Sequence, residues 1–294
     1  MCTLAILYRV ARGTPILIAA NREERYDRPT QYPKIQSGTP RVVCGIDRKA
    51  GGTWLGVNQH GLFCAVSNRR KLAVPEEPRS RGLLCRELLE LRTAKEAASH
   101  AVKELSKGIY AGANYVCADG KFAAVVHGGD KVEIVELTPG LHVLSDGNVD
   151  DPRDDRLEFV RRMLTLHTLD SAVTFLAVSS RIFGRKVDDE GRRGVVLYGP
   201  DSGTVSSSLI ALPRKIQHAV FQYAPGPPCD CAFDDLSALL RQVLSAERMR
   251  KAREGNGKSE KPSKPAHKPK VKSKIKTKAK AKAKVGAKKT VKKR

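Results

Sequence analysis

Cys2, near the start of the chain, carries a side chain that could act as a nucleophile. Because a small residue follows the initiator Met1, methionine aminopeptidase could expose Cys2 and leave one residue with both a thiol and a free α-amine. An α-amine has a reference pKa of about 7.7–8.0 and could accept the thiol proton near neutral pH. A lone cysteine is more often a small buried apolar residue than a nucleophile, so the residues expected near Cys2 must decide between these two roles.

Two apolar runs, residues 3–10 and 15–20, surround a short segment that contains glycine, and this pattern predicts a β-hairpin. The second run leads into a cluster of polar residues. If the two strands pair antiparallel, this cluster returns to the end of the sheet where Cys2 lies. Arg22 would then favour the thiolate, and Glu23 could accept a hydrogen bond from the α-ammonium group. The alternative is a solvated turn without a chemical role.

A second pair of strands is expected on either side of the segment 59–61. Gly51 and Gly52 precede its first strand and indicate a close approach of the backbone under a large ring. The ring is that of Trp54, for which a structural role is expected rather than ligand stacking. The next strand ends at Asn68, whose amide could donate a hydrogen bond to an oxyanion, although an asparagine at such a position is more often a turn residue.

The remaining elements must position these residues. Apolar residues recur at helical spacing over 80–91, 93–105, 156–166, 172–182 and 234–250. The 93–105 helix opens with a capping box, and Asp170 is a candidate N-cap for the 172–182 helix. Strands are expected over 115–118, 122–127, 132–137 and 141–144, where they would form or extend a second sheet, and over 194–198, 204–212 and 216–223. This succession fits an α+β fold of two sheets between helical layers, but it does not select that fold alone.

Charge is distributed very unevenly along the chain. The net charge is +23, and residues 255–294 contribute sixteen lysines and one arginine against one glutamate, which leaves +7 for residues 1–254. The sequence therefore predicts a folded domain over residues 1–252 and a disordered Lys/Ala/Pro-rich tail over residues 253–294, because the tail has too few large apolar residues to offset the entropy of ordering.

The composition also limits compartment and cofactors. Seven cysteines without a secretory segment before them predict reduced thiols and a cytoplasmic protein. No run approaches the roughly 20 apolar residues of a membrane span. Cys229 and Cys231 lack a second pair at zinc-site spacing, and the histidines form no ligand pattern, so no metal site is expected. No phosphate-binding glycine loop opens a helix, so no cofactor is expected either.

The tail alternates lysine with small residues and contains no aromatic residue. This pattern predicts salt-sensitive binding to the phosphate backbone of DNA or RNA, without base stacking, and an association with the nucleoid. The alternative is a solubilising extension. The lysines expected to contact phosphates are Lys268, Lys270, Lys272, Lys274, Lys276, Lys278, Lys280, Lys282, Lys284, Lys288 and Lys289.

Several short motifs follow one another along about residues 1–250: Met1-Cys2-Thr3, Asn21-Arg22-Glu23-Glu24, Arg28-Pro29-Thr30, Gly51-Gly52-Thr53-Trp54-Leu55-Gly56-Val57, Ser67-Asn68-Arg69, Ser80-Arg81-Gly82, Ala113-Asn114-Tyr115, Gly140-Leu141-His142-Val143-Leu144-Ser145, Gly203-Thr204-Val205-Ser206-Ser207-Ser208 and Pro225-Gly226-Pro227-Pro228-Cys229. In this order they resemble the NRDE family, also called the transport and Golgi organisation protein 2 family. That family is similar to the cysteine branch of the N-terminal-nucleophile hydrolases, which includes bile-salt hydrolases and penicillin V acylase.

This resemblance implies a four-layer αββα sandwich of N-terminal-nucleophile hydrolase type, with Cys2 as the nucleophile. It also implies an arginine and a carboxylate beside the nucleophile, for which Arg22 and Glu23 are the candidates, and an oxyanion hole to which Asn68 contributes. The chain departs from the family pattern in three places. Glu23 stands where the motif has Asp, and Asp146 and Val205 stand where family members commonly have Asn and Arg. An altered substrate or activity is therefore expected.

Two functions follow from these observations. The first is an amidohydrolase-like enzyme that uses Cys2 for acyl transfer on the non-peptide amide bond of an unidentified small molecule. Its candidate catalytic residues are Cys2, Arg22, Glu23, Asn68 and Asp146. The second is a non-catalytic binding protein of the same fold that its tail brings to nucleic acid, which the departures at Asp146 and Val205 favour slightly.

Overall fold

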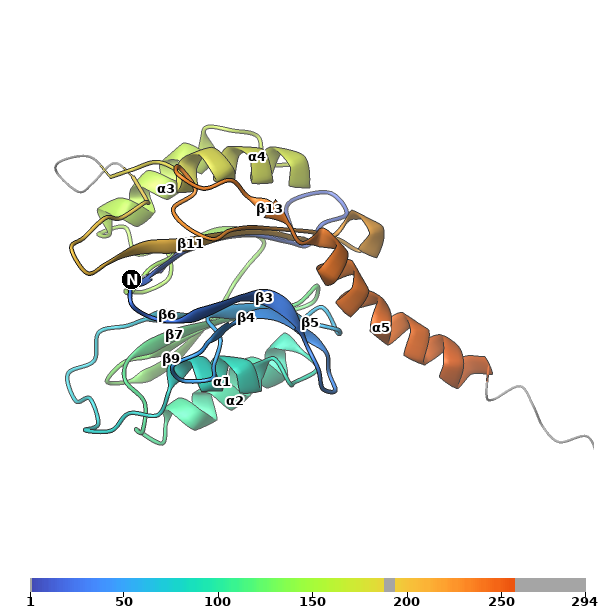
Figure 1. The fold of residues 1–294 in the computed structure, drawn as a ribbon, viewed down its shortest axis with the longest axis horizontal. Helices are drawn as coiled ribbons and strands as arrows, with labels where there is room; N and C mark the ends of the chain where they lie inside the picture. The colour runs from blue at the N-terminus through green and yellow to red at the C-terminus, as the bar shows by residue number, and fades with distance from the viewer. Residues whose placement is uncertain (1, 188–193, 257–294) are drawn as a thin grey trace, which may run out of the picture.

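The computed structural model describes residues 2–187 and 194–256. Within these residues, two β-sheets lie face to face, and a pair of helices covers the outer face of each sheet (Figure 1). The layers therefore follow the order helix, sheet, sheet, helix. The α+β, four-layer αββα sandwich that the resemblance implies is confirmed.

The strands of both sheets are antiparallel to their neighbours. Sheet A contains, in spatial order, β10 (Gly140–Leu144), β1 (Thr3–Tyr8), β2 (Ile16–Arg25), β11 (Ser202–Leu212), β12 (Val220–Ala224) and β13 (Asp234–Asp235). Sheet B contains, also in spatial order, β3 (Thr30–Gln36), β4 (Val42–Asp47), β5 (Leu55–Asn58), β6 (Phe63–Asn68), β7 (Ala113–Ala118), β8 (Ala123–Gly128) and β9 (Val132–Glu136).

Four helices form the outer layers. They are α3 (Asp155–Thr165) and α4 (Ala172–Phe183) over sheet A, and α1 (Arg81–Leu88) and α2 (Ala94–Leu105) over sheet B (Figure 1). The last helix, α5 (Ser237–Asn256), begins where the sheets end, on the side opposite the N-terminus, and packs against strands of both. A short 3-10 helix, Ile216–His218, precedes β12.

Strand alternation divides the interior into separate cores. In β1 and β2, Ile6 and Ile18 pack between the sheets, whereas Leu7 and Leu17 pack beneath α3 and α4. Another core fills the space between sheet B and the helices α1 and α2. Even-numbered residues of β1 and β2 therefore face sheet B, and odd-numbered residues face the helices, as the two-residue period of a strand requires.

The predicted N-terminal hairpin is present, with Thr3 opposite Asn21 and Tyr8 opposite Ile16. β2 does not end with its apolar run but continues through the polar cluster to Arg25, because β11 pairs with it along its whole length. The cluster therefore belongs to a strand, and the alternative of a solvated turn is wrong.

Some predictions for individual elements are wrong. The 141–144 strand pairs with β1 in sheet A, where Leu4 lies opposite Leu144, and does not extend the second sheet. Residues 194–198 contain isolated bridges and no strand. The sequence predicted neither β3 nor β4. β3 is hard to detect because it is a partly exposed edge strand interrupted by Pro33, near which its register shifts. Ser171, not Asp170, caps α4.

The close backbone approach predicted at Gly52 exists, but its partner is a helix. A Cβ at Gly52 would lie 2.1 Å from the carbonyl carbon of Gly82 in the first turn of α1. The ring of Trp54 instead lies over Gly45, where a Cβ would be 2.2 Å from the ring. Glycine at position 52 thus lets α1 pack directly on the segment that leads into β5.

The helix α5 ends at Asn256, and the division of the chain at residue 252 stays a prediction. The tail lysines named above lie outside the described residues. Among the helices that the structure describes, none is long and apolar enough to cross a membrane.

Candidate active site

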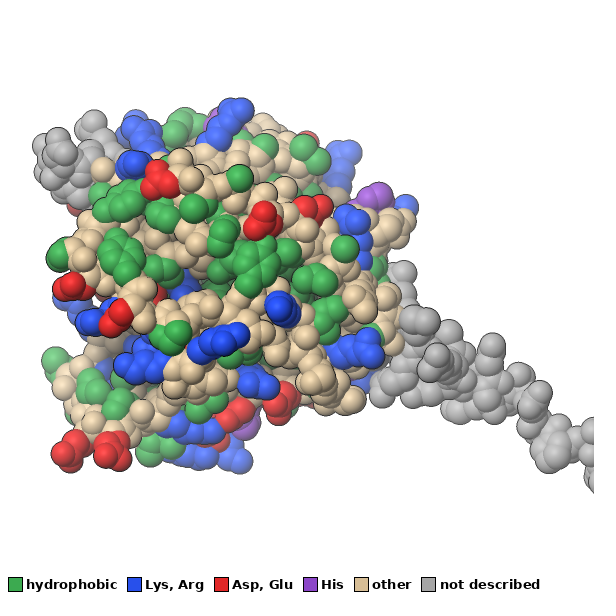
Figure 2. Space-filling model, in the orientation of Figure 1, with side chains coloured by type: hydrophobic (Ala, Val, Ile, Leu, Met, Phe, Trp, Pro, Cys, Tyr) green, Lys and Arg blue, Asp and Glu red, His purple; other side chains and the backbone are tan. Residues whose placement is uncertain are grey.

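Cys2 directly precedes β1, where the chain enters between the two sheets at the end of the molecule opposite α5 (Figure 1). Its side chain is partly exposed and lines a cleft with a volume of about 480 Å³. Figure 2 shows basic and acidic side chains gathered around a hollow at this end of the molecule. The thiol is therefore accessible from solvent through a polar opening.

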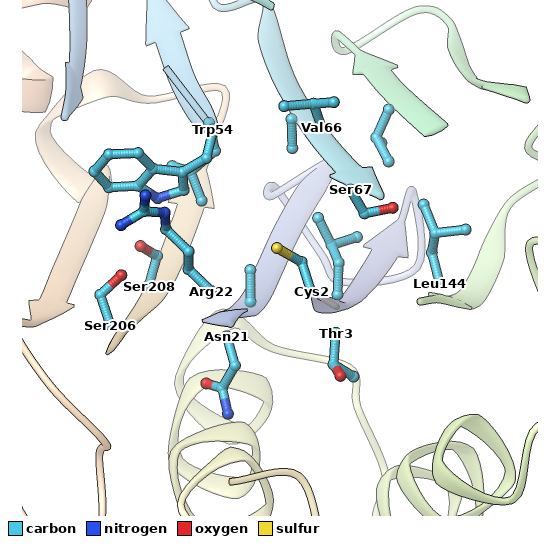
Figure 3. A pocket seen from close by; sticks show the side chains of 15 residues that line it. Cys2, Thr3, Asn21, Arg22, Trp54, Val66, Ser67, Leu144, Ser206 and Ser208 are labelled. Carbon is cyan, nitrogen blue, oxygen red and sulfur yellow. The ribbon is translucent and has the colours of Figure 1, made fainter. Parts of the chain in front are cut away.

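Behind this opening, Cys2 also lines a narrow cavity of about 20 Å³ between the sheets, large enough for about one water molecule. Figure 3 shows its sulfur directed into the space below Trp54 and Val66, whereas Thr3 and Asn21 point away toward the α3 and α4 layer. Asn21 is fixed there because its amide donates to the carbonyl oxygen of Phe183 at 2.9 Å. The thiol thus projects from the residue before β1 into the space between the sheets.

Arg22 shares this space with the thiol, because continuing the β1–β2 register beyond Thr3 and Asn21 pairs Cys2 with Arg22. The guanidinium lies 4.3 Å from the ring centroid of Trp54, a distance typical of a cation–π contact. Its Nη1 donates to Thr30 Oγ1 at 3.0 Å. These contacts hold a fixed positive charge beside the thiol, as the sequence predicted.

Glu23 is the next residue of the strand, and its side chain therefore lies on the opposite face, beneath α3 and α4. Thr204 Oγ1 donates to its Oε1 at 3.3 Å, and the backbone N–H of Thr3 also supports the ionised form. Its Oε2 has no hydrogen-bond partner among the described residues. Burial raises the pKa of Glu23 to about 8, although Arg156 on α3 acts in the opposite direction. The carboxyl group thus lies beside the main chain at the start of β1.

The environment of Cys2 raises the pKa of its thiol above the ordinary value. Burial is the main cause and the charge of Glu23 is the second, whereas Arg22 and the backbone N–H of Glu23 lower it. The sequence anticipated the effect of Arg22 but not the larger effect of burial. The neutral thiol is therefore the favoured form at neutral pH, and forming the thiolate requires a base.

Asn68 is the last residue of β6, and its exposed side chain lines the same cleft as Cys2. Its position is fixed by antiparallel pairing with Ala113 of β7. Four of the predicted catalytic residues, Cys2, Arg22, Glu23 and Asn68, therefore share one cleft although they come from three segments of the chain.

The cleft is rich in charge that the sequence did not reveal. Among the described residues that line it, the basic ones are Arg22, Arg28, Lys49, Arg79 and Arg81, and the acidic ones are Glu23, Glu24 and Asp47. Arg28 binds Asp47 through two hydrogen bonds, of 3.2 and 2.5 Å. An excess of positive charge in a cleft attracts negatively charged small molecules.

Asp146 is not among the described residues that line this cleft. It follows β10, which pairs with β1 so that Leu4 lies opposite Leu144, and two more residues of that register would lead from Cys2 to Asp146. The ladder ends at Leu144, however, and residue 146 lies in a bend. The structure therefore brings Asp146 near the start of β1 without pairing it there.

Three residues that sequence reasoning did not assign to the site hold this bend against sheet B. Asn114 donates to the carbonyl oxygens of Ser145 and Gly147 at 3.3 and 3.0 Å, and Arg69 donates to that of Gly147 at 2.8 Å. His127 Nδ1 lies 2.7 Å from Asn114 Oδ1. Burial, followed by the charge of Arg69, lowers the pKa of His127 to about 4, so its ring is neutral.

Arg69 and Asn114 lie within motifs that the sequence analysis had quoted, so their importance was detectable. His127 ends a predicted strand and carried no such signal. Among the described residues, no group of three or more His, Cys, Asp or Glu side chains could hold a metal ion.

A family model described as Transport and Golgi organisation 2 matches residues 1–176. The chain belongs to this family. It is 31% identical over 146 residues to the Transport and Golgi organization 2 homolog of Mus musculus, and 30% identical over 146 residues to the human protein, each time over 47% of this chain and 52% of the relative. The chain thus spans about half the length of the curated relatives it matches.

Several solved structures are similar to this chain at low identity. Penicillin V acylase from Agrobacterium tumefaciens has a TM-score of 0.46 and 15% identity, with 76% of this chain and 83% of that chain covered. A Caenorhabditis elegans ortholog of N-acylethanolamine-hydrolyzing acid amidase has a TM-score of 0.48 and 15% identity, with 74% and 96% covered. A mutant of the conjugated bile acid hydrolase from Clostridium perfringens has a TM-score of 0.44 and 12% identity, with 81% and 93% covered.

The part that matches the Transport and Golgi organisation 2 model includes all five predicted catalytic residues. It ends within α4, so β11 lies beyond it. β11 nevertheless contributes Thr204 to the surroundings of Glu23. The site of this family member is therefore completed by a segment outside the matched residues.

Proposed function

We propose that this protein catalyses acyl transfer on an amide substrate, with Cys2 as the nucleophile. The α-amine of Cys2, once Met1 has been removed, takes the thiol proton, and the thiolate sulfur attacks the amide carbonyl carbon. Asn68 and neighbouring backbone N–H groups donate hydrogen bonds to the oxyanion. The α-ammonium returns the proton to the leaving amine as the C–N bond breaks, and a water molecule then hydrolyses the thioester to a carboxylic acid and the free thiol.

The observation that carries this proposal is the common cleft of Cys2, Arg22, Glu23 and Asn68. A structural thiol has no need of a fixed guanidinium, a buried carboxyl group and an exposed amide around it. The other buried cysteines, Cys44, Cys64, Cys85 and Cys117, lie in the core of sheet B away from this cleft.

Glu23 supports the role of the α-amine. Its carboxyl group lies beside the start of β1, accepts a hydrogen bond from Thr204 and leaves Oε2 without a partner among the described residues. An ammonium group is a donor of three hydrogen bonds, so a processed N-terminus would satisfy this buried acceptor. Its positive charge would also lower the pKa of Glu23 and favour the carboxylate.

A screen of acyl-amide substrates tests the proposal, with release of the amine measured for the wild type, Cys2→Ala and Cys44→Ala. Cys44 is a cysteine of the sheet B core outside the cleft, so its variant is the matched control. We expect the wild type and Cys44→Ala to release amine and Cys2→Ala to release none. Equal rates for Cys2→Ala and the wild type would contradict the proposal.

The state of the N-terminus gives a second test. Intact-mass analysis should find the chain without Met1 and without acetylation, because the mechanism needs a free α-amine. Cys2 should then react with iodoacetamide at pH 7 faster than Cys229, although Cys229 is the more exposed residue and burial disfavours the Cys2 thiolate, because the free α-amine of Cys2 takes the thiol proton. A retained Met1, or slower reaction at Cys2, would favour a non-catalytic binding protein of this fold.

A second function is suggested by the charge of the C-terminal tail. Sixteen lysines between residues 255 and 294 provide most of the net positive charge of the chain, which favours binding to nucleic-acid phosphates. A chain truncated after Asn256 keeps α5 complete and removes these lysines. We expect the truncated chain to fold and to lose most retention on DNA and RNA, with full-length binding weakening steeply as salt increases. Equal retention by both chains would exclude this function.

A further inference from the structure

A second cavity adjoins the Cys2 cleft and has a different chemical character. It measures about 540 Å³ and shares Arg22 and Arg28 with the cleft. Arg22, held over Trp54 and bonded to Thr30, lines both spaces. A molecule whose reactive group lies at Cys2 could therefore extend past Arg22 into this second cavity, which we call the tyrosine groove.

Four of the seven tyrosines of the chain line the groove: Tyr26, Tyr32, Tyr198 and Tyr223. Tyr32 and Tyr223 pack edge to face with ring centroids 5.0 Å apart. Tyr26 and Tyr198 are each 49% exposed, so their rings are accessible. Aromatic walls of this kind favour a planar ring, which gains stacking or edge-to-face contacts beyond simple burial.

Hydrogen bonds fix two of these rings. Tyr32 donates its hydroxyl hydrogen to Asp234 at 2.8 Å, and Tyr198 donates to Asp230. Both carboxylates hold the hydroxyl ends, and Lys186 Nζ lies over the Tyr198 ring, 5.1 Å from its centroid. The groove is thus a preformed aromatic surface, so little conformational entropy is lost when a ligand binds.

The charged residues that line the groove are all basic. They are Arg22, Arg25 and Arg28, and no acidic residue is among the described residues that line it. Arg25 is anchored by hydrogen bonds of 3.0 and 3.1 Å to Asp27. A ligand that carries a negative charge next to its ring therefore matches this lining better than a neutral or cationic one.

Val205 determines how much room the groove has. The β11–β2 register shifts between Thr204, opposite Glu23, and Ser206, opposite Arg22, so Val205 is the extra residue of a β-bulge. Ser206 lines the narrow cavity between the sheets, whereas Thr204 and Val205 both line the groove, and the hydroxyl of Thr204 is bonded to Glu23. A longer side chain at this position would occupy the space that the short valine leaves.

We propose that the tyrosine groove binds an aromatic ring bearing an anionic group, as one part of the substrate, and that Val205 sets this specificity. The proposal names a substrate class for the acyl-transfer function and rests on it. The fit concerns binding, however, and is therefore testable without catalysis.

The test measures binding of phenylacetate, cyclohexylacetate and 2-phenylethylamine to the full-length Cys2→Ala protein by ligand-observed NMR. The second probe lacks the aromatic ring, and the third reverses the charge. We expect phenylacetate to bind about twofold to tenfold tighter than cyclohexylacetate, because an aromatic pair adds favourable contacts beyond burial. We also expect it to bind tighter than 2-phenylethylamine, because the arginines attract a carboxylate and repel an ammonium group. Equal binding of cyclohexylacetate would overturn the aromatic part of the proposal, and equal binding of 2-phenylethylamine would overturn the role of the arginines.

Variants locate the site. Val205→Gln should weaken phenylacetate binding by a similar factor, since it fills the groove without adding charge, whereas Val173→Gln on the exposed face of α4 should not. Tyr198→Ala, which alters a half-exposed residue, should also weaken binding and covers the case in which Val205→Gln does not fold. Unchanged binding in both groove variants would overturn the proposal.

Binding and turnover distinguish this proposal from the proposed function. Aromatic binding without amide turnover in the wild type would contradict only the proposed acyl-transfer activity, and turnover without a preference for aromatic ligands would contradict only the role of the tyrosine groove.

Discussion

Replacing Glu23 with glutamine should change how the stability of the protein depends on pH. Burial raises the pKa of this carboxyl group to about 8 in the folded chain, against about 4.3 for an exposed glutamate. Between these values the folded chain retains a proton that the unfolded chain has released. The stabilisation is therefore complete below the unfolded pKa and is lost as the pH rises through the folded pKa.

The size of this effect follows from the two pKa values. One pKa unit corresponds to about 1.4 kcal/mol, so the wild type should lose roughly 3–4 kcal/mol of unfolding free energy between pH 5 and pH 8 through Glu23 alone. Glutamine cannot titrate, and Glu23→Gln should lack this loss. Urea unfolding at pH 5, 6, 7 and 8 measures the difference, with the exposed Glu90→Gln as the control. Parallel stability curves for the wild type and Glu23→Gln would refute the reasoning.

Three further predictions concern the cleft and its supports. Asn68→Ala should lower the turnover number by about 10²–10³ with little change in KM, as measured by steady-state amide hydrolysis, because an oxyanion donor acts on the transition state; an unchanged rate would remove Asn68 from the site. Gly52→Ala should destabilise the fold by about 1–3 kcal/mol in urea unfolding, since its Cβ would meet the backbone of Gly82 at 2.1 Å; wild-type stability would mean that α1 shifts at no cost. Family members commonly have Asn where this chain has Asp146. Asp146→Asn should therefore raise amidase activity if the aspartate weakens catalysis, and unchanged activity would mean that residue 146 has no role in catalysis.

The sequence predicted the hairpin and the position of the polar cluster because local signals determine both. Two apolar runs around a short turn allow one antiparallel pairing, and that pairing returns Arg22 to Cys2. The capping box of α2 was equally readable, and the structure contains both of its reciprocal hydrogen bonds, between Thr93 and Glu96. Such features depend on residues that are close in sequence.

Which of the two sheets a strand joins could not be predicted from local sequence in the same way. The strand β10 has an ordinary apolar pattern, and nothing in it indicates that it pairs with β1 rather than with its sequence neighbour β9. The pairing depends on packing, since Val143 and Leu144 complete the cores on both faces of sheet A. For the same reason the role of His127 could not be predicted, because it contacts a bend that only the tertiary structure brings close.

The pKa shifts of Cys2 and Glu23 also could not be predicted without the tertiary structure. The sequence predicted that Arg22 would favour the thiolate, and its charge does act in that direction. Burial is stronger, and burial depends on the sheets and helices that enclose the end of β1. The sequence could, however, have predicted the separation of Arg22 from Glu23, because successive residues of a strand face opposite sides.

This separation leads to a last prediction, in which Arg22 and Glu23 are exchanged. The double variant Arg22→Glu/Glu23→Arg keeps composition and net charge, but it removes the cation–π contact with Trp54 and puts a second guanidinium beneath α3, near Arg156. Loss of the first contact costs about 0.5–2 kcal/mol, and a buried arginine without a counter-charge costs several kcal/mol more. The variant should therefore unfold at a much lower urea concentration than the wild type, whereas exchanging the exposed pair Arg92 and Glu90 should have little effect. Wild-type stability in the first double variant would mean that the two faces of β2 do not discriminate between these charges, and Arg22 and Glu23 could then not have the separate roles assigned to them beside Cys2.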